Sequence, residues 1–343
     1  MNSNENKKHY QLPHDFGMGG VSLGNEFEPV TDEEAHATLK TAWDEGVRYY
    51  DVAPWYGLGL SERRYGYFLH NKPRKEYVIS SKVGKLLKAS KNVVTEKGPF
   101  PFSPSPNSVT FDYSASGIRR SIEDSLQRLG IDSLDIAYVH DLSSDNPLFK
   151  EGEWLEHFEV AKKGAFPELT KMREEGIIKG WGLGVNTPEP IMKALDVADP
   201  DIFLFAAQYS LMDHENAIEE IFPAIRKHGA SLVMGSNLNA GYLSGSDRYN
   251  YGPKIPDFAQ EKREKLRKIA AAHNVDLRTA ALQFASFPDV ATAIVPGMHT
   301  PQQVKENLAS MKTKIPADFW QELKAERLIH QDAPTEKQVL TEA

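Results

Sequence analysis

The chain of 343 residues contains no cysteine, and this absence excludes disulfide bonds, thiolate nucleophiles and zinc sites with cysteine ligands. An excess of positive charge is also missing, because the formal net charge is −8. No global positive field is therefore available to hold nucleic acid or an anionic membrane surface. Apolar runs stay well short of the ~20 residues that a membrane-spanning helix requires, and the polar N-terminus lacks the apolar core of a signal peptide. We expect a cytoplasmic protein with no nucleic-acid, membrane or obligate protein partner.

Short apolar runs typical of buried strands alternate along the chain with stretches of helical periodicity. We expect strands within residues 17–23, 47–50, 77–81, 134–139, 178–185, 202–207, 231–235 and 291–295. Eight such β-then-α units predict an α/β fold, a single (β/α)8 barrel of the TIM type over residues 1–330. An open, doubly wound sheet is the alternative, but a Gly-x-Gly-x-x-Gly turn after an early strand is missing.

Helix signals lie between the expected strands. Thr31 and Glu34 have the spacing of a capping box and predict a helix that ends near Asp44, and Ser61 is expected to cap the next one. Ser116–Leu129 has helical periodicity, with Gly130 as the C-cap. Further helices are expected near 166–175, 189–197, 215–227, 256–273, 277–287 and 300–308, with a C-terminal helix beyond them.

Two long segments, 84–113 and 141–165, follow the third and fourth expected strands. The first contains the proline-rich stretch 99–106, which cannot be regular structure. In a barrel both segments belong to the C-terminal face, where long loops are typically lids or substrate walls. Residues 331–343 are expected to form a flexible tail.

Four residues suited to proton transfer stand at or just after the ends of successive expected strands: Asp51, Tyr56, Lys82 and His140. Each alone has a common structural explanation, such as a turn former, a packed ring or a solvated lysine. Together, on an alternating β/α framework, they indicate a catalytic site. Metal-dependent hydrolysis is the competing barrel chemistry. The eleven histidines include no His-x-His and no His-Glu-x-x-His, so no metal site is expected.

The residues around the second expected strand resemble the signature of the aldo-keto reductases. The signature reads Gly46-x-Arg-x-x-Asp51-x-Ala-x-x-Tyr56-Gly57, followed by Ser61-Glu62 and Gly66. Later matches in the same order are Gly182-Leu-Gly-Val-Asn186, Gln208-Tyr209, Pro296-Gly297, Thr300-Pro301, Gln303 and Glu306-Asn307. The resemblance covers about residues 17–309 and implies hydride transfer between a nicotinamide and a carbonyl or carbinol carbon, without a metal.

The resemblance to the aldo-keto reductases implies a role for each of the four residues Asp51, Tyr56, Lys82 and His140, which we call the tetrad. Tyr56 would be the general acid or base, and the ammonium of Lys82 would lower the pKa of its phenol from the ordinary ~10. Asp51 would keep Lys82 charged and oriented, and His140 would donate to or orient the substrate oxygen.

The resemblance also implies a site for NAD(P). The implied residues are Asn186, Gln208, Gly235, Ser236, Leu238, Gly241, Pro296, Gly297, Gln303, Glu306 and Asn307. Thr300-Pro301 would open a helix whose free N–H groups suit an anionic phosphate. NADP-specific relatives often carry Lys and Arg where Gly297 and Gln303 stand, so NAD is favoured, although His299 or a cation from another loop could replace those contacts.

The substrate expectation depends on the end of the seventh strand. Gly235 stands where the family commonly has a tyrosine, and Gly235-x-x-x-Asn-x-Gly241 resembles the branch of D-threo-aldose (L-fucose) 1-dehydrogenase and pyridoxal 4-dehydrogenase. Gln208 departs from that branch, which carries arginine there. An aromatic wall for a sugar or pyridine ring is expected from Trp55, Phe100, Phe102 and Tyr113. The implied reaction is oxidation of an aldose at C1 to the lactone, or reduction of an aldehyde. A general aldehyde or ketone reductase, a pyridoxal dehydrogenase and a low-turnover nucleotide-binding sensor are the alternatives.

Overall fold

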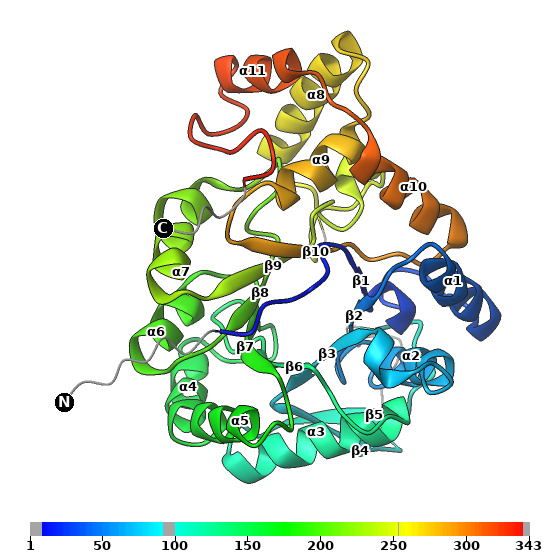
Figure 1. Ribbon diagram of the computed structural model, residues 1–343, viewed down its shortest axis with the longest axis vertical. Helices are drawn as coiled ribbons and strands as arrows, with labels where there is room; N and C mark the ends of the chain where they lie inside the picture. Colours follow the sequence, from blue (N-terminus) through cyan, green and yellow to red (C-terminus); the bar gives the residue numbers. More distant parts are fainter. Residues whose placement is uncertain (1–8, 92–99, 253, 339–343) are drawn as a thin grey trace.

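The computed structural model describes residues 9–91, 100–252 and 254–338. Eight parallel strands follow one another around a ring in the order β1-β2-β3-β6-β7-β8-β9-β10 (Figure 1). Their bounds are Gly17–Gly19, Tyr49–Asp51, Val78–Val83, Ile136–His140, Gly180–Val185, Ile202–Ala206, Ser231–Gly235 and Ala291–Val295. The ring closes between β1 and β10, where the amide of Gly19 donates to the carbonyl of Pro296 at 3.0 Å. The predicted barrel is confirmed, and the open-sheet alternative is wrong.

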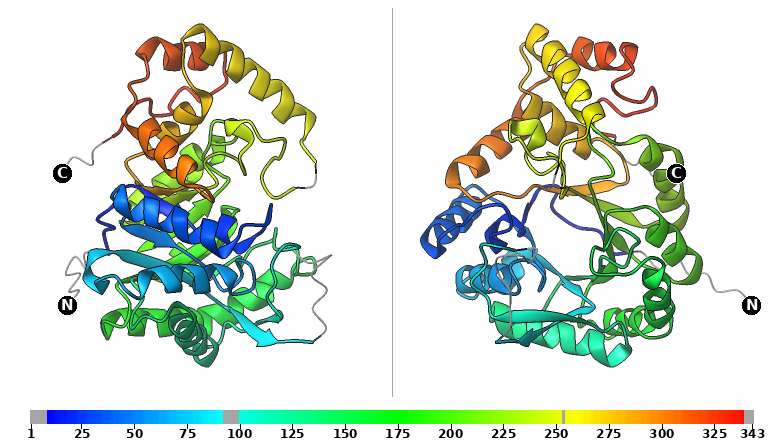
Figure 2. Two further views of the ribbon diagram at one scale, coloured as in Figure 1. Left: turned by 90° about the vertical axis from the view of Figure 1, so that its right-hand side faces the viewer. Right: turned by 180° about the vertical axis from the view of Figure 1, so that it is seen from behind.

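Helices surround the ring of strands on its outside (Figure 1). They are α1 Asp32–Asp44, α2 Leu60–Leu69, α3 Ala115–Leu129, α4 Glu153–Lys163, α5 Ala165–Glu174, α6 Glu189–Val197, α7 Phe222–His228, α8 Asp257–Ala272, α9 Leu277–Ser286, α10 Pro301–Lys312 and α11 Ala317–Ala325. Figure 2 shows that the C-terminal helices α8 and α11 lie together at one end of the molecule. Among the described residues, no helix combines the length and apolar character needed to cross a membrane.

Two large hydrophobic clusters among the described residues hold the barrel and its helices together, and a third, small one, of Ala53, Tyr56 and Phe100, lies at the C-terminal ends of the strands. The larger one joins the helices to the outward faces of the strands. The second large cluster fills the barrel and contains the buried rings of Tyr49 and Tyr138, with Leu12 and Tyr10 packed against it. Several members of this cluster, among them Tyr49, Val78 and Ile136, begin their strands, so side chains fill the N-terminal end of the barrel. The C-terminal ends are left to form the site.

Local sequence signals set several helix ends as predicted. Thr31 and Glu34 form the capping box at the start of α1, and Gly130 adopts φ +64° to end α3. Ser61 differs from the prediction because α2 already begins at Leu60. The Ser61 hydroxyl instead donates to the carbonyl of Gly20 at 2.8 Å, so it ties the loop after β1 to α2.

Both long segments contain structure that the sequence did not reveal. In the first, β4 (Lys85–Ala89) and β5 (Asn107–Phe111) form an antiparallel hairpin, while residues 100–106 have no helix or strand and Pro99 lies outside the described residues. In the second, α4 begins directly after Gly152. The prolines and glycines that marked these segments as loops interrupt only parts of them.

The segment after His330 continues to make contacts. Ala333 is buried, and the amide of Gln338 donates to the carbonyl of Phe287 at 2.9 Å. Packing therefore extends beyond residue 331, where the sequence predicted that a tail begins.

Candidate active site

A cavity of about 890 Å3 opens at the C-terminal ends of the strands, within the size range of small-molecule sites. Strand ends and the loops after β1, β2, β6, β7, β9 and β10 contribute its walls. All four members of the predicted tetrad, Asp51, Tyr56, Lys82 and His140, line it. The barrel therefore brings together residues that are up to 89 positions apart in the sequence, the span from Asp51 to His140.

Asp51 and Lys82 form a buried ion pair at the ends of two adjacent strands, β2 and β3. The Lys82 ammonium donates to one carboxylate oxygen at 2.7 Å, and the Ser80 hydroxyl donates to the other at 2.6 Å. Lys82 also donates to the carbonyl of Val52 at 3.1 Å. Both charged side chains are almost completely buried, and each has hydrogen-bond partners besides the other. We refer to Asp51 and Lys82 as the inner pair.

Tyr56 lies beside the inner pair, with the Lys82 nitrogen 4.7 Å from its ring centroid. The following Gly57 has φ +64°, and a Cβ there would lie 2.3 Å from the carbonyl oxygen of Gly24, so only glycine fits this turn. Burial raises the pKa of the Tyr56 phenol well above its ordinary value, and the charge of Asp51 raises it further. The predicted lowering of this pKa is therefore wrong, because burial disfavours the phenolate and Asp51 balances the ammonium of Lys82.

His140 lies next to Tyr56, and the two rings pack edge-to-face with their centroids 5.8 Å apart. Burial lowers the pKa of its imidazole well below the ordinary value, and the positive charges of Lys85 and Lys82 add to this effect. His140 is therefore neutral near pH 7. Its Nε2 lies 3.4 Å from a carboxylate oxygen of Asp141, whereas Nδ1 is buried without a hydrogen-bond partner. The nearby carboxylate favours the tautomer with the proton on Nε2.

A second buried ion pair, which the sequence did not reveal, joins Lys85 to Asp141. We refer to it as the outer pair. Lys85 begins β4 only three residues after Lys82, and its ammonium lies 4.4 Å from the centroid of the Trp55 ring. Burial lowers the pKa of Lys85, and Asp141 opposes that effect. Asp141 itself has φ +44°, an uncommon backbone conformation for a residue other than glycine.

Gly84 separates the two lysines and allows them to point in different directions. Its φ is +96°, and a Cβ at this position would lie 2.2 Å from the ring of Tyr113. Tyr113 is buried and donates its hydroxyl to the carbonyl of His140 at 3.2 Å. Tyr113 does not line the cavity, so its predicted place in a substrate wall is wrong; it supports the segment that carries His140.

The predicted aromatic wall is reduced to two residues. Trp55 and Phe100 line the cavity and pack edge-to-face at 5.5 Å. Phe102 is 46 % exposed and lies outside the cavity, while its carbonyl accepts a hydrogen bond from Asn25 at 3.2 Å. Aromatic composition alone could not show which rings of the long segment face inward.

Most of the predicted nucleotide-binding residues line the other part of the cavity. They are Asn186, Gly235, Ser236, Leu238, Gly241, Pro296, Gly297, Gln303, Glu306 and Asn307. Gln208 does not line it and follows Ala207, which has φ +60°. The amide of Asn186 donates to Asp145 at 3.0 Å.

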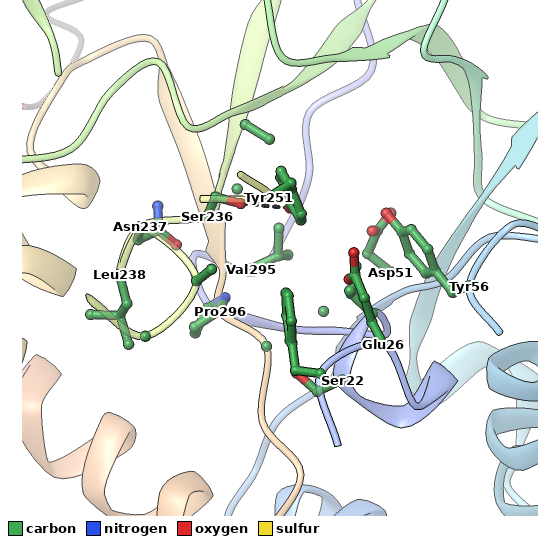
Figure 3. Close-up of a pocket in the computed structure, with 18 of the residues that line it drawn as sticks. Ser22, Glu26, Asp51, Tyr56, Ser236, Asn237, Leu238, Tyr251, Val295 and Pro296 are labelled. Atoms are coloured by element: carbon green, nitrogen blue, oxygen red, sulfur yellow. Dashed lines mark hydrogen bonds between the residues drawn. The ribbon is translucent and has the colours of Figure 1, made fainter. Parts of the chain in front are cut away.

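Several cavity residues on the nucleotide side were not predicted: Ser22, Asn237, Ser244, Ser246, Arg248 and Arg278. Ser22, Asn237, Ser246 and Arg248 lie in the segments after β1 and β9, Ser244 ends a short 3-10 helix, and Arg278 lies in the first turn of α9, so no shared sequence pattern links them. The Asn237 side-chain oxygen is buried without a hydrogen-bond partner (Figure 3). An unsatisfied acceptor, two arginines and the Thr300-capped start of α10 suit a ligand with amide and phosphate groups, so the residues fit a dinucleotide.

Comparisons with known proteins agree with this geometry. A model of the aldo/keto reductase family matches residues 15–327. A D-threo-aldose 1-dehydrogenase from a Pseudomonas species is 36 % identical over 92 % of this chain and 94 % of its own length. A pyridoxal 4-dehydrogenase from Microbacterium luteolum is 35 % identical over the same shares. Among solved structures, an aldo-keto reductase from Bacillus halodurans in its holo form has a TM-score of 0.71 at 23 % identity, over 96 % of this chain and 98 % of that one.

Proposed function

The chain belongs to the aldo/keto reductase family, and from this premise we propose that it oxidises the C1 hemiacetal of an aldose to the lactone with NAD(P). The observation that carries the proposal is the convergence of the inner pair, Tyr56 and His140 at one end of a cavity large enough for a nucleotide and a substrate. The similarity to an aldose dehydrogenase over almost the whole chain supports the substrate class.

Tyr56 is the residue that moves the proton. A nicotinamide held by the nucleotide-side residues would supply the hydride acceptor for C1 in oxidation and the hydride donor in reduction. The substrate hydroxyl must lose its proton at the same time, and Tyr56 lines the cavity beside the Lys82 ammonium as the proposed acid–base group. Because burial raises the pKa of Tyr56, the resting phenol holds its proton and suits donation to a carbonyl. In oxidation the phenolate form is required, and the Lys82 ammonium is the adjacent positive charge that stabilises it.

His140 orients the substrate oxygen. With the proton on Nε2, its neutral imidazole is a donor at the edge of the cavity, and its charge does not change near pH 7. A fixed donor aimed at an oxygen that gains negative charge lowers the barrier without reorganisation. The Tyr113 hydroxyl and Asp141 hold the histidine from two sides.

We propose that NAD is preferred to NADP. On the nucleotide side, Glu306 forms an ion pair with Arg278, and Glu28 lies 3.0 Å from Nε2 of His299. Arg278 and His299, two of the cations that could replace the missing Lys and Arg, therefore already have acidic partners, while Arg248 stacks on Phe27 and donates to the carbonyl of Ala240. A 2′-phosphate would have to displace a carboxylate, whereas two ribose hydroxyls would donate to one.

Steady-state oxidation of L-fucose, D-arabinose and pyridoxal with each nucleotide tests the proposal. We expect activity on at least one aldose, with a higher kcat/KM for NAD. Oxidation of pyridoxal alone would favour the second candidate, a pyridoxal dehydrogenase, which the relative from Microbacterium luteolum supports. Reduction of simple aldehydes without oxidation of any aldose would indicate a general reductase instead.

Tyr56→Phe separates an enzyme from a nucleotide-binding sensor. We expect turnover to fall by about 10³-fold, because the acid–base group is lost while the ring remains. Nucleotide binding, followed by quenching of the five tryptophans, should change little. Equal loss of binding and turnover would mean that Tyr56 is a structural residue.

A further inference from the structure

Six carboxylate side chains line the cavity, and five of them have partners. Asp51 pairs with Lys82, Asp141 with Lys85, Glu306 with Arg278, Glu28 with His299, and Asp145 accepts from Ser143 and Asn186. The sixth, Glu26, has no hydrogen bond or ion pair within the described ranges. A partly buried carboxylate without a donor is unusual, because the loss of hydration is not compensated.

Glu26 lies on the loop after β1, and this loop is firmly held. The Arg64 guanidinium donates to the carbonyl of Leu23 at 2.8 Å, to the side chain of Asn25 at 2.7 Å and to the carbonyl of Val30 at 2.5 Å. These bonds enclose Glu26 from both sides along the chain. Its position in the cavity is therefore fixed by the fold.

The carboxylate of Glu26 points into the part of the cavity where Tyr56 stands. Figure 3 shows Glu26, Asp51 and Tyr56 directed into the same space, with Tyr251 across from them. Glu26 lies close enough to Tyr56 and Tyr251 for its charge to raise the pKa of both phenols. Glu26 therefore lies on the side of the cavity that holds Asp51 and Tyr56, which is the substrate side in the proposed reaction.

The nearest cation does not satisfy Glu26. Arg248 exerts an attractive charge on it, but this guanidinium stacks 3.9 Å from the centroid of the Phe27 ring and donates to the carbonyl of Ala240 at 2.9 Å. Burial outweighs the attraction of Arg248 and raises the pKa of Glu26 to about 8, and the negative charge of Asp141 acts in the same direction as burial. The site therefore holds a carboxyl group that exchanges between acid and anion at moderately alkaline pH.

We propose that Glu26 is a specificity-determining residue that hydrogen-bonds a ring hydroxyl of a neutral, polyhydroxylated substrate. This inference rests on the proposed aldose oxidation. A hydroxyl can donate to a carboxylate and accept from a carboxylic acid, so it fits both forms of Glu26. A carboxylate or phosphate on the substrate would be repelled by the anion, and a purely apolar aldehyde would leave Glu26 unsatisfied.

A pair of substrates with the same ring tests the proposal. D-arabinose in its pyranose form and 2-hydroxytetrahydropyran share a six-membered cyclic hemiacetal, but only the sugar has the other ring hydroxyls. With Glu26→Ala at pH 9, we expect the ratio of kcat/KM for the sugar to kcat/KM for 2-hydroxytetrahydropyran to fall by about 10- to 100-fold. Glu26→Gln, which keeps a hydrogen-bonding group, should lower the ratio less.

A matched variant separates substrate recognition by Glu26 from a general loss of activity. Glu33→Ala makes the same change on the exposed first turn of α1 and should leave the ratio unchanged. An equal loss with both substrates, an unchanged ratio, or a parallel loss of NAD affinity in Glu26→Ala would each overturn the role of Glu26 in recognising the substrate. If the wild-type protein oxidises neither compound nor any other aldose with either nucleotide, the proposed function itself fails, and the assignment of Glu26 fails with it.

Discussion

The inner and outer pairs are both buried lysine–aspartate ion pairs beside the same cavity, yet they are built differently. In the inner pair, Asp51 and Lys82 stand on adjacent strands, and Ser80 and the Val52 carbonyl supply further hydrogen bonds. In the outer pair, Lys85 begins a hairpin, and Asp141 lies on a loop in a strained backbone conformation. The Asp141 side chain is 18 % exposed, against 3 % for Asp51.

This difference separates two tasks. The strand-borne pair holds an ammonium against the Tyr56 ring, where a small displacement would change the proposed proton transfer. The loop-borne pair lies further out, against Trp55 and His140, and acts on the groups that surround the reaction. We infer that the inner pair sets the chemistry and that the outer pair positions its neighbours.

Replacing the lysine of each ion pair in turn is the most direct test of the difference between the inner and outer pairs. Lys82→Met should lower kcat/KM by about 10³-fold, because the phenolate of Tyr56 loses its adjacent positive charge. Lys85→Met has the same change in volume and charge, and we expect a loss of about tenfold only. Both values come from steady-state oxidation with the nucleotide Kd measured in parallel. Equal losses from the two variants would contradict the division of tasks.

The pH dependence of oxidation tests the inner pair further. Because burial and Asp51 raise the pKa of Tyr56 well above 10 in the free protein, the reactive phenolate becomes more abundant throughout the accessible range. We therefore expect kcat/KM for oxidation to rise with pH up to about pH 10, by up to about tenfold per pH unit. In the same range, reduction should stay flat. A plateau in the oxidation profile below pH 9 would show that another group titrates in the rate-determining step.

Asp141→Asn sharpens the view of the outer pair. Asparagine tolerates the positive φ at this position, so the backbone should be retained. The loss of the charged partner for Lys85 and of the acceptor near His140 should lower kcat by about tenfold, equivalent to one hydrogen bond of ~1–1.5 kcal/mol. A change in KM alone, with kcat unchanged, would contradict a role in positioning His140.

Glu26 supplies the contrast to both pairs, since it is a cavity carboxylate without a partner among the described residues. Burial raises its pKa to about 8 in the folded protein, above the ordinary value of 4.5. Between about pH 4.5 and pH 8 the folded state keeps a proton that the unfolded chain has lost. The free energy of unfolding therefore falls over this range, and the loss is complete once the pH has risen through about 8. Glu26→Gln should raise Tm by a few degrees at pH 9 and by less at pH 5, measured by calorimetry. An equal change at both pH values would mean that the charge of Glu26 is not responsible.

The sequence predicted well what the strands determine. Asp51, Lys82 and His140 stand at strand ends, where the alternation of buried residues and the parallel register bring them to one face. It predicted less of what the loops determine. Lys85 belongs to a hairpin hidden in a proline-rich segment, and the place of Glu26 depends on Arg64, which is 38 positions away in the sequence. Such contacts between distant segments have no periodic signal.

Phe102 and Tyr113 are two residues that the sequence placed at the cavity and that the structure places elsewhere. The sequence predicts both rings at the cavity because they lie in the segment after β3, but one is exposed and the other is buried behind His140. Phe102 lies in the irregular stretch between the two strands of the hairpin, and Tyr113 follows its second strand, so the direction of each ring depends on contacts with distant segments rather than on a repeating pattern.

Gly84 has a consequence for any attempt to redesign this protein. Lys82 and Lys85 share one short segment, and the glycine between them turns the backbone where the Tyr113 ring leaves no room for a side chain. An insertion or deletion between the lysines would move both ammonium groups at once, so the length of this spacer is fixed. Changes of substrate are better sought by altering the length and composition of the loop after β1, whose anchor at Arg64 is independent of the lysine segment.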